Sequence, residues 1–328
     1  MRGETPSLSA NNITMPILVS GSLVYDHIMD FMDRFKNHIL PNNIHILSVC
    51  FAVEKLEKSK GGTAGNIAYN IKLLGADPII VSSVGQDGGE YMRYLGDIKI
   101  STGRIKTDKK LFTASCYITT DLDDNQITAF YNGSLGSAPD IFFNKRDKKP
   151  KWASISPTQK SVMLKHLSQC ANLGIHTIFD PGQQIPAFSN SELRKAISQT
   201  DILIGNDYEI KMIQKRINWS KKQILKRVET LVTTYGERGS QIETTDGQKI
   251  LVEACRLNQI KDPTGAGDAY RAGFMVGLDK GHNLRMCGRL GSVAASYAIE
   301  KYGTQEHKFS VEDFGKRYES LYNEQISL

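Results

Sequence analysis

The strongest constraint on the fold is a regular alternation of short apolar runs with stretches of helical periodicity. Each apolar run ends in a polar residue, a glycine or a proline, which is typical of buried strands. Alternating strands and helices predict a doubly wound α/β fold, with a mostly parallel sheet and helices on both faces. In such folds ligands bind beyond the carboxyl ends of the strands, where the polar residues of this chain gather. The expected strands are 17–21, 79–85, 153–155, 177–181, 202–206 and 230–234, and the expected helices are 66–74, 161–173 and 220–229.

Two segments break this rhythm, because apolar and polar residues alternate in 44–56 and 112–131. They predict strands of a separate small β-sheet, with a hairpin turn at 122–125. Such a half-covered sheet could decorate the core, but we favour a lid, since both segments flank motifs expected to touch substrate. The lid strands should come from about 22–60 and 110–135.

The composition is that of an ordinary soluble globular protein, with 40% hydrophobic and 23% charged residues. We expect one α/β domain over 15–328, preceded by a polar, flexible tail over 1–14. No apolar run approaches the length of a membrane span, and the net charge of +6 is spread along the chain. The basic cluster at 145–149 is interpreted as a solvated loop. We therefore expect neither a membrane nor a nucleic acid as a partner.

Five cysteines lie far apart and form no C-x-x-C pair. This odd, scattered set argues against a disulfide framework or a zinc site and favours a reducing compartment. The early apolar run 15–24 is short and contains Pro16 and Gly21, which is atypical of a secretory signal. The expected location is cytoplasmic.

The most informative motif is the loop 262–268, with the sequence DPTGAGD. Gly265 and Gly267 allow backbone N–H groups to approach a ligand without interference from a Cβ atom. The run 269–277 is expected to be a helix, so the loop lies at a helix N-terminus that attracts anions. Because a carboxylate repels phosphate, we interpret Asp268 as a base that takes a proton from a hydroxyl attacking a phosphoryl group. The alternative is an ordinary glycine turn in which Asp268 caps the helix.

Two segments near the first strands carry polar residues suited to a sugar. Asp26, close to Ser22, could accept two hydrogen bonds from a vicinal diol. In the segment GGTAGN, Gly62 permits close backbone approach and Asn66 opens the following helix. The alternatives are a solvated loop position for Asp26 and a helix N-cap for Asn66.

Two later segments are suited to a nucleotide. Asn206 and Glu209 lie one turn apart on a starting helix, where both could face a hydrated Mg²⁺, although capping alone would also explain Asn206. The glycine turn that follows the strand 230–234 could hold nucleotide phosphates or ribose through backbone groups. Its candidate residues are Thr233, Gly236 and Gly239.

Paired glutamines, Gln183 and Gln184, follow the strand 177–181. Their carboxamides could recognise the planar edge of a purine. A polar loop without a ligand is the alternative.

These motifs occur in the order shown by the ribokinase-like (PfkB) family of small-molecule kinases. The chain resembles that family from about residue 16 to about residue 320. The resemblance implies a ribokinase-like fold and phosphoryl transfer from ATP with Mg²⁺. It also implies that Asp268 is the catalytic base and that the amides of Gly265, Ala266 and Gly267 form an anion hole.

Within the family the chain is most similar to bacterial-type adenosine kinases. The segments that carry this resemblance are 21–27, 40–41, 61–66, 130–131, 180–184, 206–209 and 303–306. It implies phosphorylation of the 5′-hydroxyl of adenosine to give AMP and ADP, a reaction of purine salvage. The positions implied for the ribose hydroxyls are Asp26, Gly62 and Asn66, and those implied for the purine are Ser22, Phe130, Gln183 and Gln184. Two positions depart from the group: Cys50 replaces a small hydroxyl residue, and Cys116 lies where an aromatic partner for the base is expected.

Several alternatives stay open. A kinase for ribose, fructose or another nucleoside could use the same fold, and a catalytically silent sensor could keep the pocket alone. The absence of G-x-G-x-x-G after the first strand disfavours a dinucleotide oxidoreductase, and the absence of G-x-x-x-x-G-K-[ST] excludes a classical P-loop NTPase. Backbone carbonyls near Asp262 and Thr264 could bind a monovalent cation such as K⁺. Exposed lid strands could form a homodimer contact.

Overall fold

The computed structural model describes residues 15–145, 147–257, 259–326 and 328, so the tail predicted for 1–14 lies outside the described residues. Nine strands form the larger sheet in the order β13 (Lys249–Val252), β12 (Ser240–Thr244), β11 (Thr230–Thr234), β10 (Ile202–Asn206), β9 (His176–Phe179), β8 (Trp152–Ile155), β1 (Ile17–Ser20), β4 (Pro78–Val84) and β5 (Ile105–Thr107). The strands from β11 through β5 run parallel, whereas β12 and β13 are antiparallel additions. The predicted α/β sheet is confirmed.

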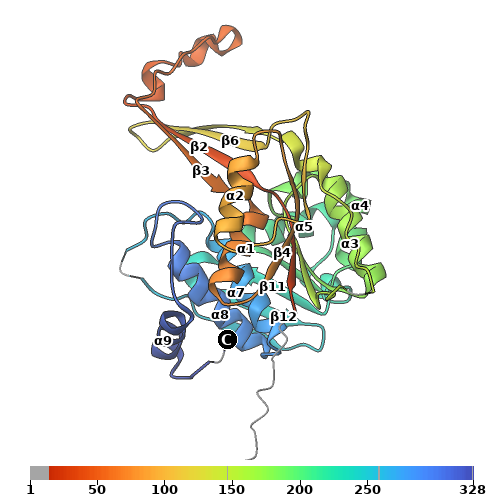
Figure 1. Cartoon of the computed structure of the whole chain (residues 1–328). Coiled ribbons are helices and arrows are strands. Elements are labelled where there is room, and N and C mark those ends of the chain that lie inside the picture. The colour runs from red at the N-terminus through yellow and green to blue at the C-terminus, as the bar shows by residue number, and fades with distance from the viewer. Residues whose placement is uncertain (1–14, 146, 258, 327) are drawn as a thin grey trace, which may run out of the picture.

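Helices cover both faces of this sheet (Figure 1). They are α1 (Thr63–Leu73), α2 (Gly89–Asp97), α3 (Lys160–Leu173), α4 (Asn190–Ser198), α5 (Asp207–Ile217), α6 (Lys221–Ile224), α7 (Ala266–Asp279), α8 (Leu284–Ala298) and α9 (Val311–Tyr322). Side chains alternate across a strand, and in β1 Ile17 and Val19 join the apolar core formed with α1, α7 and α8. Leu18 joins the opposite core, formed with α3, α4 and α5. Burial on both faces explains why the central strands are continuous apolar runs.

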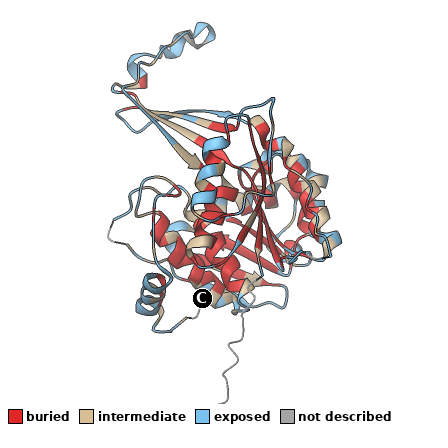
Figure 2. Cartoon of the chain, in the orientation of Figure 1, coloured by how far each residue is buried: buried red, intermediate tan, exposed pale blue. Residues whose placement is uncertain are grey.

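Buried residues concentrate in the large sheet and in α7 and α8, as Figure 2 shows. Each fully buried aliphatic side chain contributes roughly 1.5–3 kcal/mol to folding.

The five cysteines are free and form no disulfide bonds. In the part of the chain that the structure describes, no helix has both the length and the apolar character needed to cross a membrane.

The helix predicted over 220–229 is shorter than expected. Ser220 starts α6 with a capping box, but the helix ends at Ile224. The backbone N–H groups of Glu229 and Thr230 then donate to the carbonyl of Asp201. These bonds lead the chain into β11. Pairing with the sheet therefore replaces the last part of the helix that the periodicity predicted.

A separate sheet of four strands forms the small sheet predicted as a lid. Its order is β3 (Lys55–Gly61), β2 (Val24–Asp30), β6 (Ala114–Thr120) and β7 (Gln126–Tyr131), and it extends from the body of the molecule (Figure 1). The hairpin turn predicted at 122–125 joins β6 to β7, with Asp124 in the left-handed conformation (φ 59°).

The strand predicted over 44–56 is wrong for most of its length. Residues 41–46 form a 3-10 helix, η2 (Pro41–Ile46), and the strand β3 begins only at Lys55. Phe51 packs against Phe31 and Phe35, with ring centroids 4.9 Å apart in both pairs. The apolar residues of this segment therefore serve a local aromatic cluster and not an alternating strand face.

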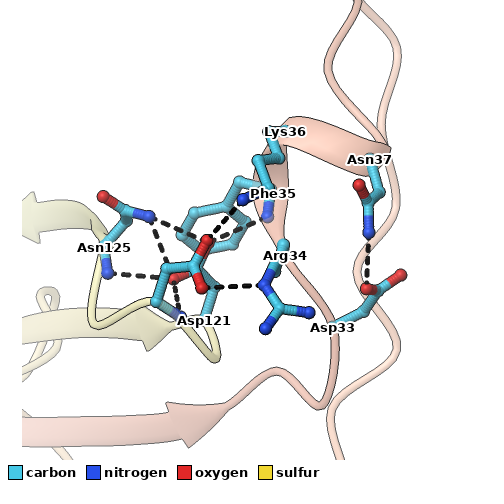
Figure 3. Close-up of polar contacts among 8 residues, drawn as sticks. Asp33, Arg34, Phe35, Lys36, Asn37, Asp121 and Asn125 are labelled. Atoms are coloured by element: carbon cyan, nitrogen blue, oxygen red, sulfur yellow. Dashed lines mark hydrogen bonds and ion pairs between the residues drawn. The ribbon is translucent and has the colours of Figure 1, made fainter.

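The segment 31–54, here called the arm, projects beyond the lid (Figure 1). Polar contacts attach it to the β6–β7 turn (Figure 3). The carboxylate of Asp121 accepts hydrogen bonds from the backbone N–H groups of Phe35 and Asn125, each across 2.9 Å. Burial acts to raise the pKa of Asp121, but these and further hydrogen bonds outweigh it and hold that pKa at about 2. Arg34 adds an ion pair to Asp123 at 2.7 Å. The arm is thus joined to the lid by polar contacts to two carboxylates, those of Asp121 and Asp123.

Candidate active site

A cavity of about 1070 Å³ lies where the carboxyl ends of the central strands meet the lid and the start of α7. It is lined by most of the residues predicted from the sequence: Ser22, Asp26, Gly62, Asn66, Phe130, Gln183, Asn206, Glu209, Gly236, Gly239, Gly265, Ala266, Gly267 and Asp268. Two predicted residues, Gln184 and Thr233, are not among the lining residues. The location agrees with the rule that doubly wound sheets bind ligands beyond their strand ends.

The glycine loop places Asp268 in the first turn of α7. Gly265 caps the helix in the left-handed conformation (φ 81°), which favours glycine because it has no Cβ atom. The first backbone bond of α7 runs from the N–H of Ala269 to the carbonyl of Gly265 across 2.9 Å. The amides before it have no partner within the helix, although that of Ala266 donates a long bond, 3.3 Å, to Pro263.

Asp268 is held by a neighbour on α1. The Asn66 side-chain amide donates to Oδ2 of Asp268 across 2.8 Å. Burial raises the pKa of Asp268, while Arg271 and the Asn66 hydrogen bond act against that rise. A carboxylate with a raised pKa that faces a cavity has the properties of a general base.

A buried polar chain orients Asn66. The amide Nε2 of Gln305 donates to Oδ1 of Asn66 across 3.0 Å and approaches the Tyr91 hydroxyl at 2.9 Å. That hydroxyl donates to the carbonyl of Gly61 at 2.7 Å. Since the Asn66 oxygen is occupied, its amide nitrogen points to Asp268. The sequence did not indicate this positioning role for Tyr91, because the contact joins distant segments.

Ser22 and Gly62 form a tight junction between β1 and α1. The Ser22 hydroxyl accepts from the N–H of Thr63 at 3.1 Å. Gly62 has φ 89°, and a Cβ atom placed there would lie 2.6 Å from the Ser22 carbonyl oxygen. Only glycine fits this close approach of two chain segments, which places both residues at the cavity wall.

The lid contributes one row of side chains to the cavity. Asp26, Cys116 and Phe130 are neighbours in strand register on β2, β6 and β7. Burial raises the pKa of Asp26 to about 6, and it also raises the pKa of Cys116, with a smaller contribution from Asp26. Cys50 is exposed and does not line the cavity. Phe130 therefore faces a thiol across the strand pair where a second aromatic ring was expected.

The opposite part of the cavity is built by helix and turn backbones. Asn206 and Glu209 form a capping box at the start of α5, each side chain accepting from the other's N–H at 2.8 Å. Gly236 and Gly239 both have positive φ, 60° and 82°, in the turn between β11 and β12. Strand alternation in β11 buries Thr233 in the interior, and the neighbouring Thr234 lines the cavity in its place.

The two predicted glutamines separate in the structure. They lie in η4 (Gly182–Ala187), a 3-10 helix that begins after Pro181, so successive side chains point in different directions. Gln183 lines the cavity and Gln184 does not.

Arg271 is a cavity residue that the sequence analysis missed. Its Nε lies 2.6 Å from Oδ2 of Asp180, and both side chains are almost fully buried. A signal was present, because Arg271 is the charged residue in the otherwise apolar or small run 269–277. Its partner Asp180, however, directly follows β9, far from Arg271 in the sequence, so the ion pair could not be inferred.

Residues 22–309 match the model of the pfkB family of carbohydrate kinases, and the chain belongs to this family. It is therefore a phosphotransferase that acts on a hydroxyl group. Kinases of this family use ATP together with a divalent metal.

The chain is similar to several nucleoside kinases along most of its length. One from Methanothermobacter thermautotrophicus is 32% identical over 295 residues, which are 88% of this chain and 91% of the relative. The structure of Burkholderia thailandensis nucleoside kinase in complex with inosine has a TM-score of 0.83 and 33% identity, covering 94% of this chain and 99% of that chain. The structure of Methanocaldococcus jannaschii nucleoside kinase, an archaeal member of the ribokinase family, has a TM-score of 0.83, 30% identity and the same coverage. The predicted ribokinase-like fold, with its large and small sheets, is confirmed.

Proposed function

We propose that this protein transfers the γ-phosphoryl group of ATP to the 5′-hydroxyl of adenosine, giving AMP and ADP. The observation that carries the proposal is the position of Asp268. It lies at the N-terminus of α7, lines the cavity and is oriented by Asn66. A base beside the backbone N–H groups of a helix N-terminus suits the attack of a hydroxyl on a phosphoryl group.

In this proposal Asp268 accepts the proton of the 5′-hydroxyl as the oxygen forms its bond to the γ-phosphorus. The bond from that phosphorus to the bridging oxygen breaks, and ADP leaves with the electron pair. The amides of Gly265, Ala266 and Gly267 stabilise charge on the transferring group, which is the main source of catalysis in such reactions. The lid covers the cavity and excludes water as a competing acceptor.

Glu209 is suited to a hydrated divalent ion. One carboxylate oxygen, Oε2, caps α5, and the side chain also lines the cavity. We propose that Glu209 contacts Mg²⁺ through water and not directly. The ion, when bound with ATP, would neutralise charge on the β- and γ-phosphates.

The residues proposed for the ribose and the purine favour a nucleoside acceptor. Asp26, Gly62 and Asn66 line the same cavity as Asp268, and Asn66 contacts Asp268 directly, so they are placed to receive the hydroxyls of a ribose. Gln183 and Phe130 add a carboxamide and an aromatic ring, which a free sugar does not need. Since a carboxamide offers both a donor and an acceptor, Gln183 suits adenine and also the hypoxanthine of inosine, the ligand of the Burkholderia relative. Another nucleoside or a sugar is therefore the alternative.

A ligand panel tests the acceptor. Thermal unfolding is measured with adenosine, inosine, guanosine, ribose and fructose, each with and without ATP and Mg²⁺. A ligand that binds the folded state raises the apparent stability by mass action. We expect the largest shift, and the fastest ADP release in a coupled assay, with adenosine. A larger response to a free sugar than to any nucleoside would contradict the proposal.

Two accessory features belong to the same proposal. Backbone carbonyls near Asp262 and Thr264 could hold K⁺. The ADP-release assay tests this site when K⁺ is replaced with tetramethylammonium.

The edge strands β3 and β7 expose Leu56, Ile127 and Tyr131, and we propose that a second copy covers them. Light scattering should then give a dimer mass, and a monomer mass at assay concentration would contradict this contact.

A further inference from the structure

Arg271 lies one turn after Asp268 on α7, so both side chains emerge on the same side of the helix. Its side chain is only 8% exposed, and that of its partner Asp180 is 3% exposed. Burial acts to lower the pKa of Arg271, but the surrounding carboxylates outweigh it and raise that pKa. The guanidinium is therefore a buried, permanently charged group.

The guanidinium also lies against the anion-hole loop. A Cβ atom placed on Gly267 would be 2.7 Å from Nη1 of Arg271, which is closer than atoms can approach. A larger residue at position 267 would therefore displace the guanidinium of Arg271. Arg271, Gly267 and Asp268 line the same cavity.

The charged groups around Asp268 come from its own helix and from two other segments. Arg271 is on the same helix, Glu209 is on α5, and Asp180 follows β9. Three carboxylates thus surround one guanidinium in a buried region. Oδ1 of Asp180 and Nε of Arg271 have no hydrogen-bond partner within the described residues, so the 2.6 Å contact between the two side chains is an ion pair.

We propose that Arg271, held in place by its ion pair with Asp180, is a positioning residue that keeps the Asp268 carboxylate in its charged, proton-accepting form. This inference rests on the proposed role of Asp268 as the base. It assigns to the Asp180–Arg271 pair a function in the reaction and not only in the core.

The direction of the effect follows from the charges. Burial raises the pKa of Asp268, and Arg271 is the strongest influence that opposes the rise. Removing the guanidinium should therefore raise that pKa further. Because a base works only when it is ionised, activity would be lost at the acidic end of the pH range and recovered as pH rises.

The test is the pH dependence of kcat in Arg271→Met and Arg271→Lys, compared with the unchanged enzyme. For Arg271→Met we expect the acidic limb of the kcat–pH profile to move to higher pH by about one unit, so that kcat falls by up to about tenfold on that limb and recovers at high pH. Arg271→Lys keeps a positive charge, so the acidic limb of its kcat–pH profile should lie closer to that of the unchanged enzyme. A purely structural role would lower kcat by the same factor at every pH.

Arg271→Met leaves Asp180 buried and unpaired, which could prevent folding. The double variant Asp180→Asn/Arg271→Met removes that unpaired charge and still lacks the guanidinium, so it should show the same displaced acidic limb. A folded single or double variant whose acidic limb coincides with that of the unchanged enzyme would overturn the inference. Asp268→Asn is measured in parallel to distinguish the two hypotheses. If this variant stays active, Asp268 is not the base and the proposed function is contradicted, whatever Arg271 does.

Discussion

The side-chain amide of Asn66 donates a hydrogen bond to the carboxylate of Asp268 across 2.8 Å, although 202 positions separate the two residues in the chain. Asn66 starts from α1, after the first strand, and Asp268 from α7, near the end of the fold. The two helices pack side by side over one face of the sheet. The bond therefore joins the segment expected to hold the ribose to the segment expected to perform the chemistry.

Asn66→Ala should lower kcat by roughly tenfold to a hundredfold, because a hydrogen bond to a charged group contributes about 1.5–3 kcal/mol. The loss should be visible in single-turnover measurements with saturating adenosine. Gln305→Leu should act in the same direction and less strongly, since it only frees the Asn66 amide to rotate. Normal turnover in Asn66→Ala would show that Asp268 needs no orienting partner.

Gln183→Ala should reduce the preference for adenosine over ribose, because the carboxamide that faces the cavity is removed. The ratio of kcat/KM values for the two acceptors measures this preference. Gln184→Ala is the matched control: the same substitution, one residue further along, should leave the ratio unchanged. If both substitutions changed the ratio equally, Gln183 would have no specific contact with the adenine ring.

Adenosine binding should weaken as pH falls through about 6, where Asp26 becomes protonated. Burial raises the pKa of Asp26 above the ordinary value of an aspartate, and only the ionised carboxylate accepts two hydrogen bonds from a ribose diol. Calorimetric titration between about pH 5 and pH 8 should show this loss, and Asp26→Asn should remove the pH dependence. Asp30→Asn, at the end of the same strand, is the control and should keep it. An affinity of the unchanged enzyme that is constant over this range would exclude Asp26 from the ribose site.

The parallel sheet was predictable because its strands are buried on both faces. Runs such as 202–206 are apolar throughout, and a glycine or a polar residue ends each of them. The antiparallel strands β12 and β13 were not predicted, since they are short and partly exposed. The segment 44–56 was wrongly predicted as a strand, because its apolar Phe51 packs against Phe31 and Phe35, a contact that local periodicity does not encode.

In the candidate site, too, some residues could be predicted from the sequence and others could not. Asp268 and the glycine loop carry a local signal, because loop, carboxylate and helix start are consecutive in the sequence. Arg271 and Asp180 meet only after β9 and α7 have packed together, so neither residue alone indicated the pair. Gln183 and Gln184 are equivalent as sequence, and only the path of the backbone through η4 distinguishes them.

The central claim is that Asp268 acts as the base for phosphoryl transfer. The most direct test is kcat of Asp268→Asn in a coupled ADP-release assay with adenosine, ATP and Mg²⁺, together with the adenosine dissociation constant. We predict that kcat falls by about 10²–10⁴-fold, while the affinity for adenosine stays close to that of the unchanged enzyme. A variant that retains near-normal kcat would contradict the account.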